Sequence, residues 1–87
     1  MKLRWTEAAS SQLEALAERS PVQAVAVVRA MEWMAKTSFS LGRRVSGGTI
    51  RDQRYWPVPP QGVYYHVKDD LIIVTAVADA RQRREPW

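Results

Sequence analysis

The stretch that decides the fold is residues 63–78, Val-Tyr-Tyr-His-Val-Lys-Asp-Asp-Leu-Ile-Ile-Val-Thr-Ala-Val-Ala. Apolar and polar residues alternate over 63–68, which is the pattern of a half-buried strand. Residues 71–78 are apolar on both faces, which is typical of a strand inside a sheet. Asp69-Asp70 between them favours a tight turn. The stretch therefore predicts an antiparallel hairpin whose second strand is interior.

Two further strands are predicted outward from this hairpin. Residues 49–56 carry Ile50, Tyr55 and Trp56, and Pro57–Gly62 after them favours a loop. Because only short turns join the last three strands, we expect an antiparallel meander. Residues 2–5 alternate as a short strand at the start of the chain.

Two helices separate the first strand from the meander. Thr6 precedes an apolar periodic segment over 7–19 and is predicted to cap it. Pro21 favours the first position of a second helix that extends to about Ser38. Ser20 and Gln23 have the spacing of a capping box. The sequence thus predicts one α+β domain over 1–87, with a two-helix hairpin on one face of a small antiparallel sheet and the order β-α-α-β-β-β.

Composition excludes several classes of site. The 87 residues contain no cysteine and one histidine, so neither a disulfide, a thiolate zinc site nor a multi-histidine site can form. We predict no metal and no other cofactor. No apolar run approaches the roughly 18 residues of a membrane span, and none follows the N-terminus. We therefore expect a cytoplasmic protein that makes no membrane contact.

The net charge is +4, and ten of the thirteen basic residues are arginines. A guanidinium offers a planar fork of donors that suits carboxylates and phosphates. This balance favours an anionic partner, either nucleic acid or an acidic polypeptide. Solubility of a small basic domain is an equally simple interpretation.

The second predicted helix is unusually apolar, because Arg29, Glu32 and Lys36 leave only a narrow polar edge. Trp33, like Trp5, is interpreted as a core side chain. A helix of this kind must be covered on more than one side. We expect a partner protein to supply part of that cover, at Val22, Val25, Val28, Met31 and Trp33.

No catalytic motif stands out. His66 shares a predicted strand face with Tyr64 and Lys68, and this trio can bind or cleave a phosphodiester. His66 would then move a proton and Lys68 would counter charge. The simpler interpretation is an exposed polar strand face. Arg51 and Arg54 have odd spacing, so at most one of them can join His66.

The densest cationic cluster follows the last strand, at Arg81, Arg83 and Arg84. A solvated tail is one interpretation. Trp87 favours the other, because an amphipathic aromatic beside arginines suits a binding interface. These four residues are the predicted target-binding set.

The chain resembles the RelE/ParE superfamily of bacterial type II toxin–antitoxin toxins over nearly its whole length. The resemblance rests on the order and spacing of several segments rather than on one motif. They are Trp5-Thr6-Glu7-Ala8-Ala9, Ser20-Pro21, Leu41-Gly42-Arg43, Arg51, Val63-Tyr64-Tyr65-His66-Val67, Leu71-Ile72-Ile73-Val74-Thr75-Ala76-Val77 and Arg83-Arg84-Glu85-Pro86-Trp87.

This resemblance implies one of two activities, since both occur on the same fold. The ParE-like branch inhibits DNA gyrase by binding, and the Arg-Arg-Glu-Pro-Trp ending is similar to that branch. The RelE-like branch cleaves messenger RNA in the ribosome. Here only Arg51 or Arg54, together with His66, Lys68 and Arg81, could serve such a nuclease.

The resemblance favours a gyrase-inhibiting toxin that is not an enzyme and acts in plasmid stabilisation. It also implies a hetero-oligomer with a cognate antitoxin, whose binding segment is acidic to amphipathic and folds on binding. A ribosome-dependent mRNA endonuclease is the alternative. A non-toxic RNA-binding module is compatible with the composition as well.

Overall fold

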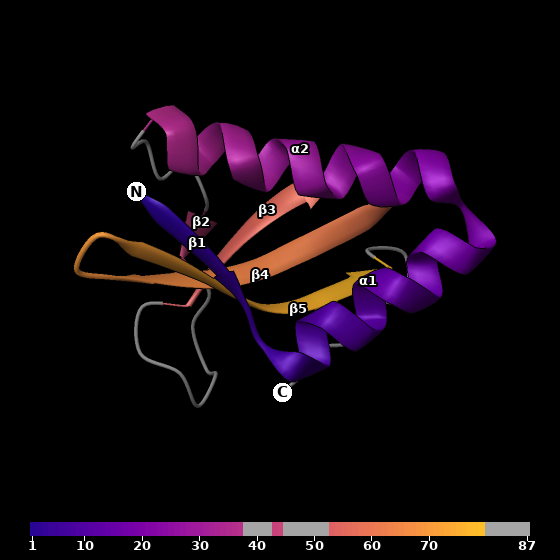
Figure 1. Cartoon of the computed structure of the whole chain (residues 1–87), viewed down its shortest axis with the longest axis horizontal. Coiled ribbons are helices and arrows are strands. Elements are labelled where there is room, and N and C mark those ends of the chain that lie inside the picture. Colours follow the sequence, from indigo (N-terminus) through magenta and orange to yellow (C-terminus); the bar gives the residue numbers. More distant parts are fainter. Residues whose placement is uncertain (38–42, 45–52, 80–87) are drawn as a thin grey trace.

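The computed structural model of the chain describes residues 1–37, 43–44 and 53–79 (Figure 1). The elements follow the order β1, α1, α2, β2, β3, β4 and β5. Their bounds are β1 Lys2–Trp5, α1 Glu7–Arg19, α2 Pro21–Thr37, β2 Arg43–Arg44, β3 Arg54–Val58, β4 Gln61–Lys68 and β5 Leu71–Asp79. The predicted α+β order is confirmed, with β2 as a short addition.

The strands form one sheet in the order β1-β5-β4-β3-β2. β3, β4 and β5 pair antiparallel, as the meander predicted, and β5 is interior between β1 and β4. One part of the prediction was wrong: the sheet is mixed, because β1 pairs with β5 in parallel. In the β4–β5 hairpin one edge of β5 is left unpaired, and β1 pairs with that edge. The parallel direction of β1 leads the chain directly into α1. The amide of Thr6 accordingly donates to the carbonyl of Val74.

The turn between β4 and β5 is formed by Asp69 and Asp70, as predicted. Asp69 has a φ of 55°, in the left-handed region. Aspartate tolerates this conformation better than most residues, because its short polar side chain bonds locally. A two-residue turn with positive φ also matches the right-handed twist of the strands it joins.

A β-bulge interrupts the pairing of β4 with β5. Tyr64 lies opposite Ala76 and Tyr65 lies opposite Val74, so Thr75 is an extra residue in β5. Side chains alternate along a strand, and one extra residue changes which face the following side chains occupy. Val74 and Val77 therefore both belong to the core cluster, three residues apart.

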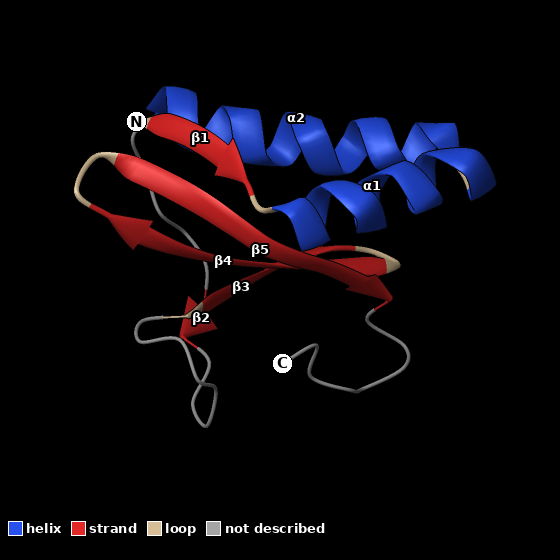
Figure 2. Cartoon of the chain, turned by 60° about the horizontal axis from the view of Figure 1, so that its bottom comes forward, coloured by secondary structure: helices blue, strands red, loops and turns tan. Residues whose placement is uncertain are grey.

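Both helices lie on one face of the sheet (Figure 2). Thr6 caps α1 as predicted, and its Oγ1 accepts from the Ala9 amide at 3.2 Å. The capping box at α2 was wrong. Instead, the Gln23 side-chain amide donates to the carbonyls of Val58, at 2.7 Å, and Pro59, at 2.8 Å. The Ser20 amide, which the box would have bonded to the Gln23 side-chain oxygen, donates to the Leu16 carbonyl at the end of α1.

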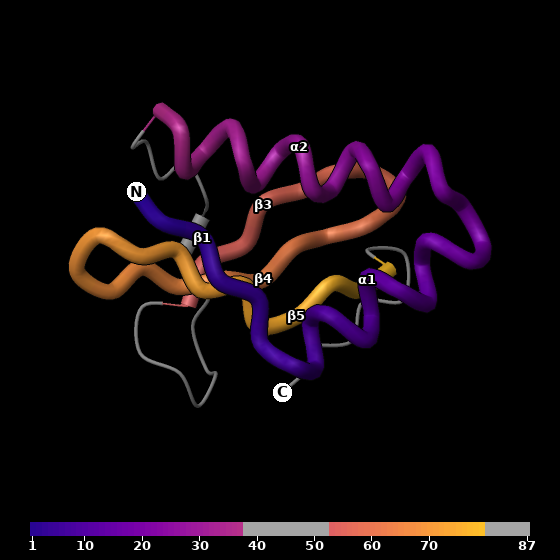
Figure 3. The backbone as a smooth tube through the Cα atoms, in the orientation of Figure 1, coloured from indigo at the N-terminus to yellow at the C-terminus, as the bar shows by residue number. Residues whose placement is uncertain are grey.

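The core fills the space between the helix pair and the sheet, and the tube in Figure 3 traces the chain around it. Apolar side chains from both layers meet there, and its largest fully buried members are Tyr65, Met31, Met34 and Ile72. Trp5 and Trp56 pack against this core and stay partly exposed. The prediction of Trp33 as a core residue was wrong, because half of that residue remains exposed on α2.

The strand predicted over 49–56 is β3, and the structure places it at Arg54–Val58. Pro57, expected in a loop, lies within β3 opposite Gly62. Among the described residues, β2 pairs with Arg54 and Tyr55 and does not reach Pro57, so β3 is an edge strand there. A proline is compatible with an edge position because its missing N–H is then not needed for pairing.

Candidate functional site

The face of the sheet opposite the helices carries a tyrosine pair. Tyr55 on β3 lies opposite Tyr64 on β4, and their ring centroids are 5.0 Å apart in a tilted arrangement. Gly62 leaves room for this pair: a Cβ atom there would lie 2.1 Å from Cε2 of Tyr55. Glycine is therefore required for the Tyr55 ring to rest on the strand.

A buried polar network joins the coil before β3 to the bulge. Gln53 is 1% exposed, and its Nε2 donates to Oγ1 of Thr75 at 2.9 Å. Thr75 Oγ1 donates in turn to the carbonyl of Tyr64 at 3.2 Å. Thr6 Oγ1 lies 3.4 Å from the Thr75 carbonyl and donates to it. The bulge is thus bonded both across the sheet and to the start of α1.

The structure separates two residues of the predicted nuclease set. Arg54 lies directly opposite Tyr65, which is a core residue, so Arg54 shares the helix-covered face. His66 follows Tyr65 on β4 and therefore projects to the other face. Lys68 shares the face of His66 and is exposed at the end of β4. Arg51 and Arg81 lie outside the described residues.

His66 is partly buried. No hydrogen-bond partner for its Nδ1 is present among residues 1–37, 43–44 and 53–79. Within the same residues no group of three His, Cys, Asp or Glu side chains gathers in a way that could hold a metal ion. The tail set Arg81, Arg83, Arg84 and Trp87 also lies outside the described residues.

Four of the five residues predicted to meet a partner protein are at the surface of α2. Val22 is 82% exposed, and Val25 and Trp33 are about half exposed, at 48% and 50%. Val28 is partly buried. The prediction that Met31 contacts the partner was wrong. Met31 faces the sheet and is fully buried in the core. Two exposed valines and a tryptophan on one helix form an unusual surface for a small protein.

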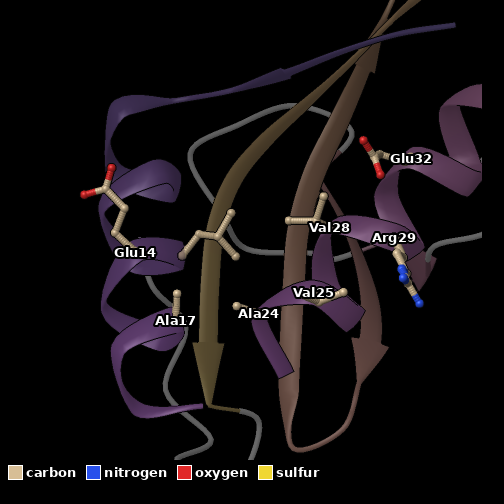
Figure 4. Close-up of a pocket in the computed structure, with 8 residues that line it drawn as sticks. Glu14, Ala17, Ala24, Val25, Val28, Arg29 and Glu32 are labelled. Atoms are coloured by element: carbon tan, nitrogen blue, oxygen red, sulfur yellow. The ribbon is translucent and has the colours of Figure 1, made fainter. Parts of the chain in front are cut away.

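A groove between α1 and α2, with a volume of about 400 Å³, adjoins this surface (Figure 4). Its wall is apolar and includes Leu13, Ala17, Ala24, Val25 and Val28. Glu14 on α1 and Glu32 on α2 line it as well, together with Arg29. A second hollow of about 390 Å³ lies beside it and shares Val25 and Arg29. The two hollows follow α2 over more than one helical turn.

Sequence reasoning missed the groove and the role of Gln53. The groove exists because Ala17 and Ala24 are small where the helices face each other, and alanine spacing alone does not reveal which faces meet. Gln53 gave no signal, because a lone glutamine before a strand is ordinary.

No family model matches the chain, and no curated protein shows significant sequence similarity to it. Solved structures do match over nearly the whole chain. A chain of the E. coli DinJ-YafQ complex superposes with a TM-score of 0.78 at 11% identity, covering 97% of this chain and 98% of that one. A copper-bound mutant toxin from Helicobacter pylori gives 0.73 at 14% identity, covering 97% and 99%. A chain of the chromosomal ParDE toxin–antitoxin system from P. aeruginosa gives 0.60 at 20% identity, covering 91% and 95%.

The chain has the fold that these structures share, as the resemblance implied. The E. coli DinJ-YafQ pair is described as a toxin–antitoxin complex. This fold places the tyrosine pair and His66 on the sheet face opposite α1 and α2, and the apolar surface of α2 on the other side of the sheet. In the described part of the chain no helix is long and apolar enough to cross a membrane.

Proposed function

We propose that this protein is the toxin of a type II toxin–antitoxin module. The observation that carries the proposal is the match of the whole domain to such toxins, with a TM-score of 0.78 over 97% of the chain. The match covers the helix pair and the meander together.

A cognate antitoxin neutralises the protein by covering the outer surface of α2. Val22, Val25 and Trp33 support this part, because large apolar side chains at 48–82% exposure are stabilised when a partner removes them from water. Val28 lines the adjoining groove and extends the same surface. The toxin and antitoxin then form a hetero-oligomer.

The toxin acts on DNA gyrase by binding rather than by cleaving RNA. Arg54 and His66 lie on opposite faces of the sheet, which disfavours a joint acid–base and cationic site made from them. The ParDE likeness, at 20% identity, agrees with this branch. Arg81, Arg83, Arg84 and Trp87 are the proposed target-binding residues.

A ribosome-dependent mRNA endonuclease is the second candidate. The observation that favours it is the shared face of Tyr64, His66 and Lys68 on β4, opposite the helices. His66 would transfer a proton there and Lys68 would stabilise the negative charge on phosphate. Fold alone does not choose between the two activities.

The test has two stages. Induction of the chain alone in a bacterial host should arrest growth, and co-expression of the adjacent antitoxin gene should restore it. Purified protein should then inhibit supercoiling by gyrase and leave mRNA intact on translating ribosomes. Harmless expression contradicts the toxin proposal. Codon-positioned mRNA cleavage that is lost in His66→Ala and kept in the matched surface variant Lys36→Ala supports the endonuclease instead.

A further inference from the structure

The two layers of the protein differ in charge. The helical hairpin, residues 7–37, contains four glutamates against three basic residues, so its formal charge is −1. The rest of the chain contains ten basic and five acidic residues, which gives +5 and accounts for the total of +4. The basic balance of the protein therefore does not extend to its helix layer.

Within the helix layer, the glutamates lie beside the interhelical groove. Glu14 belongs to α1 and Glu32 to α2, and Figure 4 shows them on its two sides. Both residues are exposed. In the described part of the chain, neither carboxylate lies within 4 Å of a cationic nitrogen. Two carboxylates and one guanidinium, that of Arg29, thus border an apolar wall.

The shape of the groove suits a helix. It follows α2 from Ala24 to Glu32, which is about 12 Å at the rise of an α-helix. An amphipathic helix placed in such a groove buries one apolar stripe and keeps polar residues on both sides of that stripe. Those flanking positions come next to Glu14 and Glu32, as charged residues flank the seam of a coiled coil.

We propose that the interhelical groove binds an amphipathic helix that carries Lys or Arg on both sides of its apolar stripe. The inference rests on the proposed function in taking the antitoxin as the source of this helix. It differs from the acidic-to-amphipathic segment that the resemblance implied, because the helix layer itself carries a formal charge of −1. Arg29 adds one position where the bound helix is expected to carry a carboxylate.

The charge preference can be measured with two synthetic peptides of about 20 residues, long enough for several helical turns. Both carry the same Leu stripe at helical spacing. One has Lys and the other Glu at the positions flanking the stripe. Titration calorimetry at low salt should show that the Lys peptide binds the wild-type chain about tenfold tighter. The difference should shrink at high salt, because exposed ion pairs are screened.

Variants locate the site. Glu14→Lys/Glu32→Lys should reverse the preference of the two peptides. Glu14→Lys alone should reduce it, and the matched variant Glu18→Lys should keep it, since Glu18 is exposed on the same helix and does not line the groove. Val25→Asp should weaken both peptides at least tenfold. Thermal melting confirms that each variant is folded.

Several outcomes overturn the inference. They are equal binding of the two peptides, preference for the Glu peptide, no binding of either to the wild-type chain, or binding that Val25→Asp leaves unchanged. The test does not use growth arrest. A chain that is harmless in cells and still prefers the Lys peptide refutes the proposed function and supports the groove chemistry, whereas a toxic chain without the preference does the reverse.

Discussion

The sheet layer and the helix layer differ in how far contacts within the chain satisfy them. The strands are paired along most of their length, and the bulge in β5 is held by bonds from Gln53 and Thr6. Among residues 1–37, 43–44 and 53–79, the helix pair packs on the sheet through its inner side, and α2 presents Val22, Val25 and Trp33 outward. Such surfaces in soluble proteins commonly mark interaction sites. The difference supports the proposal that a partner protein covers the outer surface of α2.

The largest loss of stability is expected from a substitution between the helix layer and the sheet. Met31→Ala removes a fully buried side chain between α2 and the sheet, and it should lower the free energy of unfolding by about 2–5 kcal/mol. Urea denaturation measures this. The matched variant Met31→Leu conserves volume and should lose less than about 1.5 kcal/mol. Near-native stability of Met31→Ala would show that the layers do not depend on this contact.

The sheet layer alone is tested at Gly62. Gly62→Ala forces the Tyr55 ring away from the strand, and overpacking of this kind destabilises by about 1–3 kcal/mol. If the ring is the cause, the added cost should largely disappear in a Tyr55→Ala background. A double-mutant cycle from thermal melts gives that coupling. Additive effects would place the constraint in the backbone instead.

The helix layer is tested at its start. Thr6→Ala removes the cap of α1 and the bond to the Thr75 carbonyl, and it should destabilise by about 1 kcal/mol. Thr6→Ser keeps the hydroxyl and serves as the control. Circular dichroism melts compare the two. Equal melting temperatures would mean that neither hydrogen bond contributes.

The smallest effect on stability, and a large one on activity, is expected in the tail. Arg83→Glu/Arg84→Glu should change stability by only about ±0.5 kcal/mol, because the sequence predicts a basic tail here and surface substitutions usually have effects of this size. We expect toxicity to be lost and antitoxin capture to be retained. Growth assays, melting and pull-down measure the three properties. Joint loss of toxicity and capture would contradict the proposal that the tail binds the target and α2 binds the antitoxin.

Several structural features that depend on a few neighbouring residues were predicted correctly from the sequence. The hairpin over 63–78 was predicted with its turn and its interior strand, because alternation and a double-aspartate turn are read within a few residues. The Thr6 cap was predicted for the same reason.

Features that depend on distant segments were not predicted. The parallel pairing of β1 with β5 joins residues about 70 positions apart in the sequence. Trp33 was predicted in the core, yet its exposure depends on which face of α2 packs on the sheet, and half of the residue stays exposed. Met31, two residues earlier, takes the buried position instead. The α2 residues remain a prediction for partner binding, as do the tail arginines for the target.

The extra residue at Thr75 has a consequence for alignment. In a relative that lacks the bulge, residues after the insertion would occupy the opposite face in the same alignment column. A correct alignment therefore needs a one-residue gap at Thr75. Without the gap, Ala76 would be compared with core positions and Val77 with outward ones. A strand that keeps its structure can in this way lose its sequence similarity through one insertion.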